Sequence, residues 1–252
     1  MSAGRRRVLV TGASRGIGRA VARAFAQRGD VVALGYRANE DAAAAALAAL
    51  PGEGHRVFQA DLTDLEQARA LVDRAADAMS GLDVLIGNAG GGRRHRIDED
   101  DAATWSDAWR EVLDLNLVAQ ANLAHAAARR MIEGGGGRMV FVSSRGAFRG
   151  EPDQPAYGAA KAGLNAMAQS LAVQLAPYRI YVHVVAPGFV DTDLARDRLD
   201  GPGGDAIRAQ SPTGRVATPE EVAHVALFLA SEGAEFTTGT IVDVNGASYL
   251  RN

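Results

Sequence analysis

The 252-residue sequence contains no cysteine. Disulfide bonds and thiol chemistry are therefore excluded, although the absence does not decide the compartment. No apolar run is long enough to span a bilayer, and the one that follows the basic N-terminus is too short for a signal peptide. Lysine and arginine total 27 against 30 aspartates and glutamates, so no nucleic-acid or membrane footprint appears. We expect a cytoplasmic protein without a bound metal ion.

Apolar strands alternate with helices along the whole chain, and no linker or internal repeat interrupts them. Near-continuous apolar strands of this kind indicate a parallel sheet that is covered on both faces. We expect one domain over residues 1–252. The predicted strands are 6–11, 31–36, 55–60, 82–87, 138–143, 179–186 and 240–244. The first predicted helix begins near residue 17 and closes at Gly29. The later predicted helices are 39–50, 64–80, 103–132, 155–177 and 219–231.

A glycine-rich turn, Thr11–Gly18, connects the first strand to the first helix. Glycines at this place let the backbone approach a pyrophosphate at the positive end of a helix. The spacing is Gly-x3-Gly-x-Gly rather than Gly-x-Gly-x-x-Gly, and no Gly-Lys-Ser/Thr ending follows, so a P-loop is not expected. Such turns also occur without a ligand, but the strand–turn–helix context favours dinucleotide binding.

The end of the second strand should indicate which dinucleotide is bound. An acid there accepts the ribose 2′-hydroxyl of NAD, whereas an arginine accommodates the 2′-phosphate of NADP. The strand ends at Tyr36 and Arg37, and no acid precedes Glu40. A single exposed arginine is usually a solvated charge, but Arg15 in the glycine turn can reach the same phosphate. We therefore predict NADP(H).

The segment that begins at Pro155 predicts a helix on which Tyr157 and Lys161 share one face. An ammonium about 4 Å from a phenol, at an effective dielectric of about 20, stabilises the phenolate by roughly 4 kcal/mol. That corresponds to roughly three pKa units and would bring the phenol near pH 7, where it can exchange a proton with a carbonyl or an alcohol. Alone, the pair is more often an ordinary surface pair.

Together these motifs resemble those of the short-chain dehydrogenase/reductase family over nearly the whole length. Besides the glycine turn and Tyr157-x3-Lys161, the matching elements are Asp61-Leu62, Asn88-Ala89-Gly90, Asn116, Ser144, Pro187-Gly188 and Thr192. The resemblance implies a single doubly wound Rossmann domain with a seven-stranded parallel sheet. It also implies an oxidoreductase that reduces a ketone or 3-oxoacyl-type carbonyl, or oxidises the alcohol. The alternative is a non-catalytic dinucleotide-binding regulator or scaffold on the same fold.

The resemblance implies roles for individual residues. Tyr157 would be the general acid, Lys161 would lower its pKa and hold the nicotinamide ribose, Ser144 would hydrogen-bond the substrate oxygen, and Asn116 would position a proton-relaying water. The cofactor-binding residues would be Gly12, Ser14, Arg15, Gly16, Ile17, Gly18, Arg37, Asp61, Leu62, Asn88, Ala89, Gly90, Tyr157, Lys161, Pro187, Gly188, Val190 and Thr192.

Within the family, the chain is most similar to the 3-oxoacyl-carrier-protein reductase branch, on residues 214–222 and 228–231 near the C-terminus, with departures. Val173 stands where those reductases commonly have an arginine, which removes an expected contact for an acidic carrier. His183 replaces an asparagine, Gly87 replaces the first asparagine of Asn-Asn-Ala-Gly, and Asn245-Gly246-Ala247 replaces Asp-Gly-Gly. The implied partners are a small-molecule carbonyl or alcohol and further copies of the chain, in a homotetramer or homodimer. The two long helices, 103–132 and 155–177, would pair with a second copy, and helix 219–231 and the last strand would form a second interface.

Arginines gather near the expected substrate site. Arg93, Arg94 and Arg96 share a loop with an acidic run, Asp98–Asp101, so a solvated loop is the simpler interpretation. The alternative is an anionic or strongly polar substrate held by one or two of the arginines, which include Arg145 directly after Ser144 and Arg149. Residues 193–213 are expected to form a mobile lid over the substrate.

Overall fold

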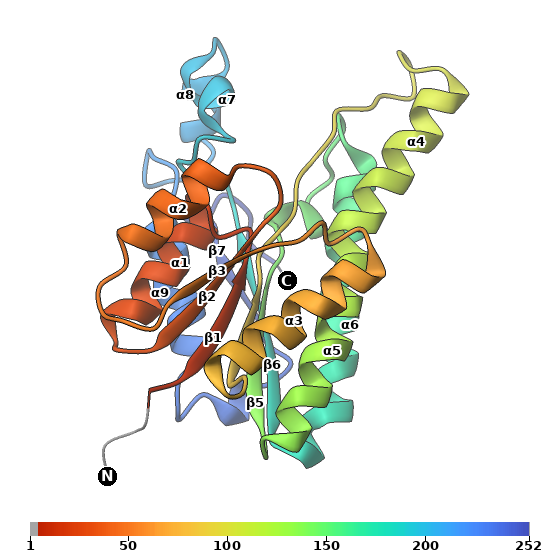
Figure 1. The fold of residues 1–252 in the computed structure, drawn as a ribbon. Coiled ribbons are helices and arrows are strands. Elements are labelled where there is room, and N and C mark those ends of the chain that lie inside the picture. The colour runs from red at the N-terminus through yellow and green to blue at the C-terminus, as the bar shows by residue number, and fades with distance from the viewer. Residues whose placement is uncertain (1–4, 252) are drawn as a thin grey trace.

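The computed structural model describes residues 5–251, which form a seven-stranded sheet in the order β3-β2-β1-β4-β5-β6-β7 (Figure 1). Every neighbouring pair is parallel. The strands are β1 (Arg7–Thr11), β2 (Val31–Tyr36), β3 (Arg56–Gln59), β4 (Val84–Gly87), β5 (Gly137–Val142), β6 (Ile180–Pro187) and β7 (Ile241–Val244). The predicted fold class is confirmed, and each strand begins and ends within two residues of its prediction.

Helices cover both faces of the sheet because successive strand residues point to opposite sides. In β1, Leu9 packs into the core cluster beneath α3, α5 and α6, whereas Val8 and Val10 pack with α1, α2 and α9. All three residues are fully buried, as in a parallel sheet with both faces covered. The helices of eight or more residues are α1 (Gly16–Gln27), α2 (Glu40–Ala48), α3 (Leu65–Met79), α4 (Ala102–Leu113), α5 (Ala119–Glu133), α6 (Pro155–Leu175) and α9 (Pro219–Leu229).

The helix predicted over 103–132 is present as an unbroken run of helical residues, but it is not α-helical throughout. A π-helical segment, η1 (Asp114–Val118), separates α4 from α5. π-helical turns occur mostly as single bulges and are frequent at functional sites. The predicted residue Asn116 lies at the centre of this segment and is fully buried.

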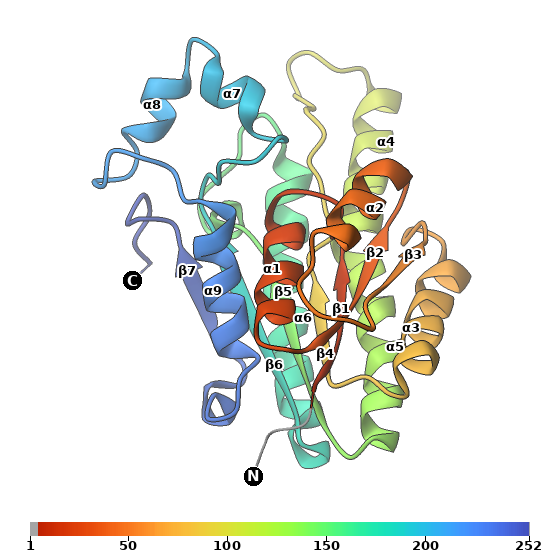
Figure 2. The same ribbon diagram turned by 60° about the vertical axis from the view of Figure 1, so that its left-hand side comes forward.

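The sheet has a topological switch point between β1 and β4, which are neighbours although they are not consecutive in the chain. In sheets of this kind, ligands bind in the crevice outside the carboxyl ends of the strands at the switch point. Two short helices, α7 (Arg196–Asp200) and α8 (Gly204–Arg208), lie above this end of the sheet (Figure 2). Among residues 5–251, no helix combines the length and the apolar character needed to cross a membrane.

Candidate functional site

The glycine turn lies at the switch point and is shaped for close approach. Gly12 and Gly16 have φ angles of +63° and +53°, which glycine adopts without strain. A Cβ on Gly18 would lie 2.3 Å from the carbonyl oxygen of Gly12, so no larger residue fits there without a shift. No side chain caps the N-terminus of α1, and its first turn carries no acidic residue. Its backbone N–H groups and positive dipole end therefore suit an anion.

Asn88 fixes this turn from the end of β4. Its side-chain amide donates hydrogen bonds to the carbonyl oxygens of Thr11 and Gly12 at 2.9 and 3.2 Å. The Thr11 hydroxyl in turn accepts from the backbone N–H groups of Asn88 and Ala89 at 3.0 and 3.1 Å. Thr11 is not among the predicted cofactor-binding residues, although its hydroxyl joins the two loops at the switch point. A threonine closing an otherwise apolar strand is the signal that could have identified it.

The segment after β6 reaches the same turn. A Cβ on Gly16 would lie 3.3 Å from the Cγ2 atom of Thr192, so the two loops are in near contact. Val190 forms an isolated parallel bridge with Ala217, which holds the segment in place. The structure therefore brings the predicted residues on three separate loops to one end of the sheet. The remaining predicted residues are Ser14 in the glycine turn, Ile17 in the first turn of α1, Ala89 and Gly90 after β4, Pro187 and Gly188 at the end of β6, and Asp61 and Leu62 on a fourth loop, which follows β3.

Arg15 and Arg37 are both exposed at this end of the sheet, and neither forms an ion pair with any residue from 5 to 251. Hydrogen bonds from Thr63 lower the pKa of the Asp61 carboxyl, with a smaller contribution from the charge of Arg37. The Asp61 carboxylate is therefore charged at neutral pH and accepts hydrogen bonds. The guanidinium N–H groups of Arg37 nearby donate to no residue from 5 to 251. The first acid after β2 is Glu40, which already belongs to α2.

The four predicted catalytic residues come from three elements. Ser144 follows β5, and its hydroxyl accepts a hydrogen bond from the Gly146 N–H at 3.0 Å. Tyr157 and Lys161 lie one turn apart on α6, and the Lys161 ammonium is 5.6 Å from the centre of the tyrosine ring. Asn116 approaches from η1. A Cβ on Gly90 would lie 2.7 Å from the Asn116 amide oxygen and 3.3 Å from the Lys161 nitrogen, so the loop after β4 lies beside both.

Asn116 is held by hydrogen bonds at both ends of its amide. Its nitrogen donates to the carbonyl oxygens of Val112 and Gly91 at 2.9 and 2.8 Å, and its oxygen accepts from the Gly91 N–H at 3.2 Å. The Asn116 side chain, in the π-helical segment, reaches Gly91 in the loop after β4. Its amide nitrogen also donates to the Val112 carbonyl oxygen of α4. Asn116 thus ties α4 to the loop that passes over Lys161.

Lys161 is 3 % exposed and is the only lysine in the chain. Its ammonium donates to the Val142 carbonyl oxygen at 2.9 Å. Burial lowers the pKa of Lys161 to about 8, because a desolvated ammonium is costly. The choice of lysine at this one position, in a chain with 26 arginines, is itself a sequence signal that Lys161 has a special role.

The expectation that Lys161 brings the pKa of Tyr157 toward 7 is wrong for this structure. Burial raises the pKa of the Tyr157 hydroxyl, and the neighbouring Ser144 hydroxyl lowers it only in part. The physical reason is that the sequence argument counted the attraction of the ammonium and left out desolvation of the phenol. The ammonium is also directed at Val142 rather than at the phenol oxygen.

The arginines near the site differ in burial and in their bonding partners. Arg93, Arg94 and Arg96 are paired with carboxylates at 2.7 to 2.9 Å, which supports the interpretation of a solvated loop. Arg145 differs because it is 5 % exposed and has no ion-pair partner among residues 5–251. Arg149 hydrogen-bonds Gln210, which follows α8, at 2.9 Å.

His95 is a structural residue that the sequence analysis did not assign. It is 1 % exposed and packs edge-on against Trp105 and Trp109. Its Nδ1 atom lies 2.8 Å from the Arg93 carbonyl oxygen, and its Nε2 atom accepts the Ala156 N–H at 3.2 Å. His95 therefore clamps the arginine loop to the first turn of α6, one residue before Tyr157.

Comparisons with known proteins identify relatives that match nearly the whole chain. A family model described as enoyl-(acyl carrier protein) reductase matches residues 12–247. Cis-4-hydroxycyclohexanecarboxylate dehydrogenase from Sinomonas cyclohexanicum is 40 % identical over 241 residues, which is 94 % of each chain. The 3-oxoacyl-(acyl-carrier-protein) reductase FabG of Escherichia coli (strain K12) is 35 % identical over 96 % of each chain.

A solved structure shares the architecture at similar identity. The short-chain dehydrogenase from Burkholderia cenocepacia J2315 in complex with NADP superposes with a TM-score of 0.87 at 34 % identity, over 96 % of this chain and 97 % of that chain. The likeness spans the glycine turn, the loops after β4 and β6, and α6, since coverage is nearly complete.

Proposed function

The chain belongs to the short-chain dehydrogenase/reductase family, and we propose that it is an NADPH-dependent enzyme that reduces a ketone or 3-oxoacyl-type carbonyl, or oxidises the corresponding alcohol. Oxidoreduction between carbonyl and alcohol groups is common to the named dehydrogenases and reductases that it matches. The observation that carries the proposal is the convergence of Ser144, Tyr157 and Lys161 beside the switch point of the sheet.

Several features of the chain fit a nicotinamide dinucleotide. The close approach that Gly18 permits and the uncapped N-terminus of α1 suit its pyrophosphate. Arg37 and Arg15 have free donors for a 2′-phosphate, and β2 ends without a carboxylate that would accept a 2′-hydroxyl. The relative from Burkholderia cenocepacia was solved with NADP. When bound, the cofactor supplies or accepts the hydride.

The residues around the reacting oxygen would handle the proton. Tyr157 donates a proton to the carbonyl oxygen during reduction, and the raised pKa of its hydroxyl keeps that proton in place at neutral pH. The Ser144 hydroxyl donates a hydrogen bond where negative charge develops on the same oxygen. Lys161, with a pKa of about 8, remains mostly protonated at pH 7. It would supply the proton that restores the Tyr157 hydroxyl after the reaction.

The substrate is proposed to be a free small molecule rather than a group on a carrier protein. Val173 is 81 % exposed on α6, so the position where carrier-protein reductases commonly have an arginine offers no charge to an acidic carrier. The relative from Sinomonas cyclohexanicum is named for cis-4-hydroxycyclohexanecarboxylate, a small polar alcohol. Ketones of that size fit the proposal better than long acyl chains.

Two further elements complete the proposal. Residues 193–213, which include α7 and α8, would close over the substrate, and the Arg149–Gln210 hydrogen bond ties this segment to the loop after Ser144.

The chain would assemble as a homodimer or homotetramer. Phe228 on α9 and Phe236 are exposed apolar side chains that a second copy could cover.

The proposal is tested by following nicotinamide absorbance at 340 nm, which is standard for this cofactor, with a panel of ketones under NADPH and alcohols under NADP⁺. A panel that contains both cyclic and linear compounds, with and without a carboxylate, is the most informative. Turnover of at least one compound supports the proposal. Tight NADPH binding without turnover of any compound would favour the non-catalytic regulator instead.

A further inference from the structure

Arg145 and Lys161 are the only arginine or lysine side chains among residues 5–251 that are buried. Lys161 belongs to the catalytic group described above, whereas Arg145 has no assigned role. A buried guanidinium is costly unless a negative group pairs with it. No carboxylate of the described residues lies within ion-pair distance of Arg145, although Glu151 attracts it from farther away. The charge is therefore uncompensated at close range.

The contacts of the Arg145 side chain leave most of its donors free. One terminal nitrogen donates to the Ser248 hydroxyl at 2.8 Å, and the guanidinium lies 5.5 Å from the centre of the Phe189 ring. A guanidinium carries five N–H donors in a planar fork, and no other hydrogen bond joins this one to residues 5–251. Arg149 adds a second positive charge nearby, so the local field repels cations and favours an anion.

The guanidinium is placed beside the proposed site of reaction. Arg145 directly follows Ser144, and its side chain reaches Ser248 in the segment after β7. Ser248 itself adjoins the end of β6, since a Cβ on Gly188 would lie 3.4 Å from its hydroxyl oxygen. Arg145 thus lies between Ser144, the proposed hydrogen-bond donor to the substrate oxygen, and Ser248, which adjoins the segment beside the proposed nicotinamide site. The 2′-phosphate donors, Arg15 and Arg37, follow β1 and β2 instead.

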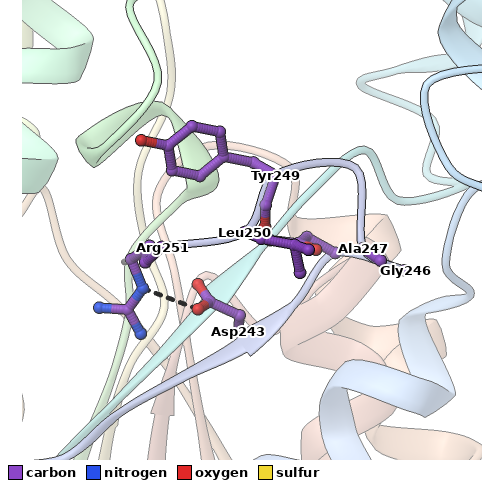
Figure 3. A pocket seen from close by; sticks show the side chains of 7 residues that line it. Asp243, Gly246, Ala247, Tyr249, Leu250 and Arg251 are labelled. Carbon is purple, nitrogen blue, oxygen red and sulfur yellow. Dashed lines mark hydrogen bonds and ion pairs between the residues drawn. The ribbon is translucent and has the colours of Figure 1, made fainter.

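Two other arginines near Arg145 are paired with carboxylates, and a third, Arg149, donates to a neutral amide. Arg251 pairs with Asp243 at 2.7 Å on the C-terminal segment, and its guanidinium stacks over Phe148 at 4.2 Å (Figure 3 shows the pair). Arg93 pairs with Glu111 at 2.8 Å. Arg149 is engaged with Gln210. Arg145 alone in this group combines burial with free donors.

We propose that Arg145 is a specificity residue that binds a carboxylate on the substrate, so that the enzyme acts on oxo- or hydroxycarboxylates in which the acid lies several atoms from the reacting carbon. The inference rests on the proposed function. A carboxylate accepts two parallel N–H bonds from one guanidinium, which suits the remaining fork of Arg145. The Phe189 ring supplies an apolar face for the carbon frame between the two groups. Arg145 positions the substrate and takes no part in proton or hydride transfer.

The test compares two ketones of equal shape, 4-oxocyclohexanecarboxylate and its neutral carboxamide, with NADPH in the wild-type enzyme and in three variants. Arg145→Gln removes the charge, and Arg145→Lys keeps it without the planar fork. Arg93→Gln is the matched control, because it removes an arginine that Glu111 already pairs. The readout is the ratio of kcat/KM for the carboxylate to that for the carboxamide. Charge-assisted pairing predicts a wild-type ratio of about 10 to 100.

The ratio should fall to about one in Arg145→Gln, fall less in Arg145→Lys, and stay unchanged in Arg93→Gln. A wild-type ratio of one, or a ratio that Arg145→Gln leaves intact, would overturn the proposal. A rise in the KM for NADPH with the carboxamide as substrate would also overturn it, because Arg145 would then serve the cofactor. If only neutral ketones are reduced, the proposed function stands and this inference fails.

A binding measurement decides the inference even if no ketone is reduced. Cyclohexanecarboxylate, which cannot react, is titrated into the complex with NADP⁺ by calorimetry. Wild-type enzyme should bind it at least about tenfold more tightly than Arg145→Gln does, as one charge-assisted pair predicts. Equal affinity in the two proteins, with matching thermal midpoints, would contradict the subsite, whatever the outcome for turnover.

Discussion

The Lys161 ammonium lies 5.6 Å from the centre of the Tyr157 ring and donates its hydrogen bond to the Val142 carbonyl, not to the phenol. Burial acts on both groups but in opposite directions. It lowers the pKa of the lysine to about 8 and raises the pKa of the tyrosine above its ordinary value. As the pH rises, the lysine therefore loses its proton before the tyrosine does.

This relationship is directly measurable, because the chain has no other lysine. Protein labelled with ¹³C-lysine should give one side-chain Cε signal in NMR spectra, and its chemical shift reports the protonation state. We predict a titration midpoint near 8 in the folded protein. In the same protein unfolded by urea, the midpoint should return to about 10.4. A folded-state midpoint at the unfolded value would show that Lys161 is solvated and would contradict the burial described above.

Ala247 has a φ angle of +58°, a left-handed conformation that suits glycine. It stands where the related reductases have the second glycine of Asp-Gly-Gly. Ala247→Gly should relieve roughly 1–2 kcal/mol of strain and lose about 0.4–1 kcal/mol through the greater entropy of the unfolded chain. The net expectation is a gain of about 0.8 kcal/mol, from a range of roughly 0 to 1.6 kcal/mol, in the free energy of unfolding, measured by urea titration.

The control for this substitution is Ala44→Gly in the exposed part of α2. There the same chemical change should cost about 1 kcal/mol, because glycine in a helix interior is unfavourable. Equal effects at both positions would mean that the conformation of Ala247 carries no strain.

Arg37→Asp tests the proposed cofactor preference. The wild-type enzyme should favour NADPH over NADH by about 10- to 10³-fold in kcat/KM, since each charge-assisted hydrogen bond to the 2′-phosphate contributes roughly 1.5–3 kcal/mol before discounting for solvent. The variant should reverse the preference, because it removes a donor and adds repulsion. Arg23→Asp, at an exposed position on α1, is the control and should leave the preference unchanged.

Two results would contradict this assignment in different ways. A wild-type preference for NADH would mean that the end of β2 does not select NADP(H). A preference for NADPH that survives Arg37→Asp would place the 2′-phosphate on Arg15 and the glycine turn instead.

The sheet could be predicted from the sequence because its strands are short apolar runs such as Val8–Val10 and Val31–Leu34, each flanked by turn residues. The family resemblance implied that Ser144 and Tyr157 belong to one site, and in the structure the loop after β5 leads directly into α6. These features depend on local composition and on spacing along the chain. Both are visible without knowledge of the tertiary structure.

What the sequence did not predict depends on tertiary surroundings. The π-helical segment at Asp114–Val118 has no local breaker residue and is accompanied by contacts between Asn116 and the loop after β4. The raised pKa of Tyr157 comes from burial, which spacing alone cannot reveal. Likewise, Arg145 and Arg93 look equivalent as letters, and only the folded chain distinguishes a buried guanidinium from a paired one.

The central claim is that Tyr157 supplies the proton for carbonyl reduction, and Tyr157→Phe tests it most directly. The change keeps the ring and removes only the hydroxyl. With a ketone that the wild-type enzyme reduces, single-turnover oxidation of bound NADPH should slow by at least about 10²-fold. The dissociation constant for NADPH, measured by fluorescence, should change little. Near-normal turnover in the variant would remove Tyr157 from the mechanism and contradict the account.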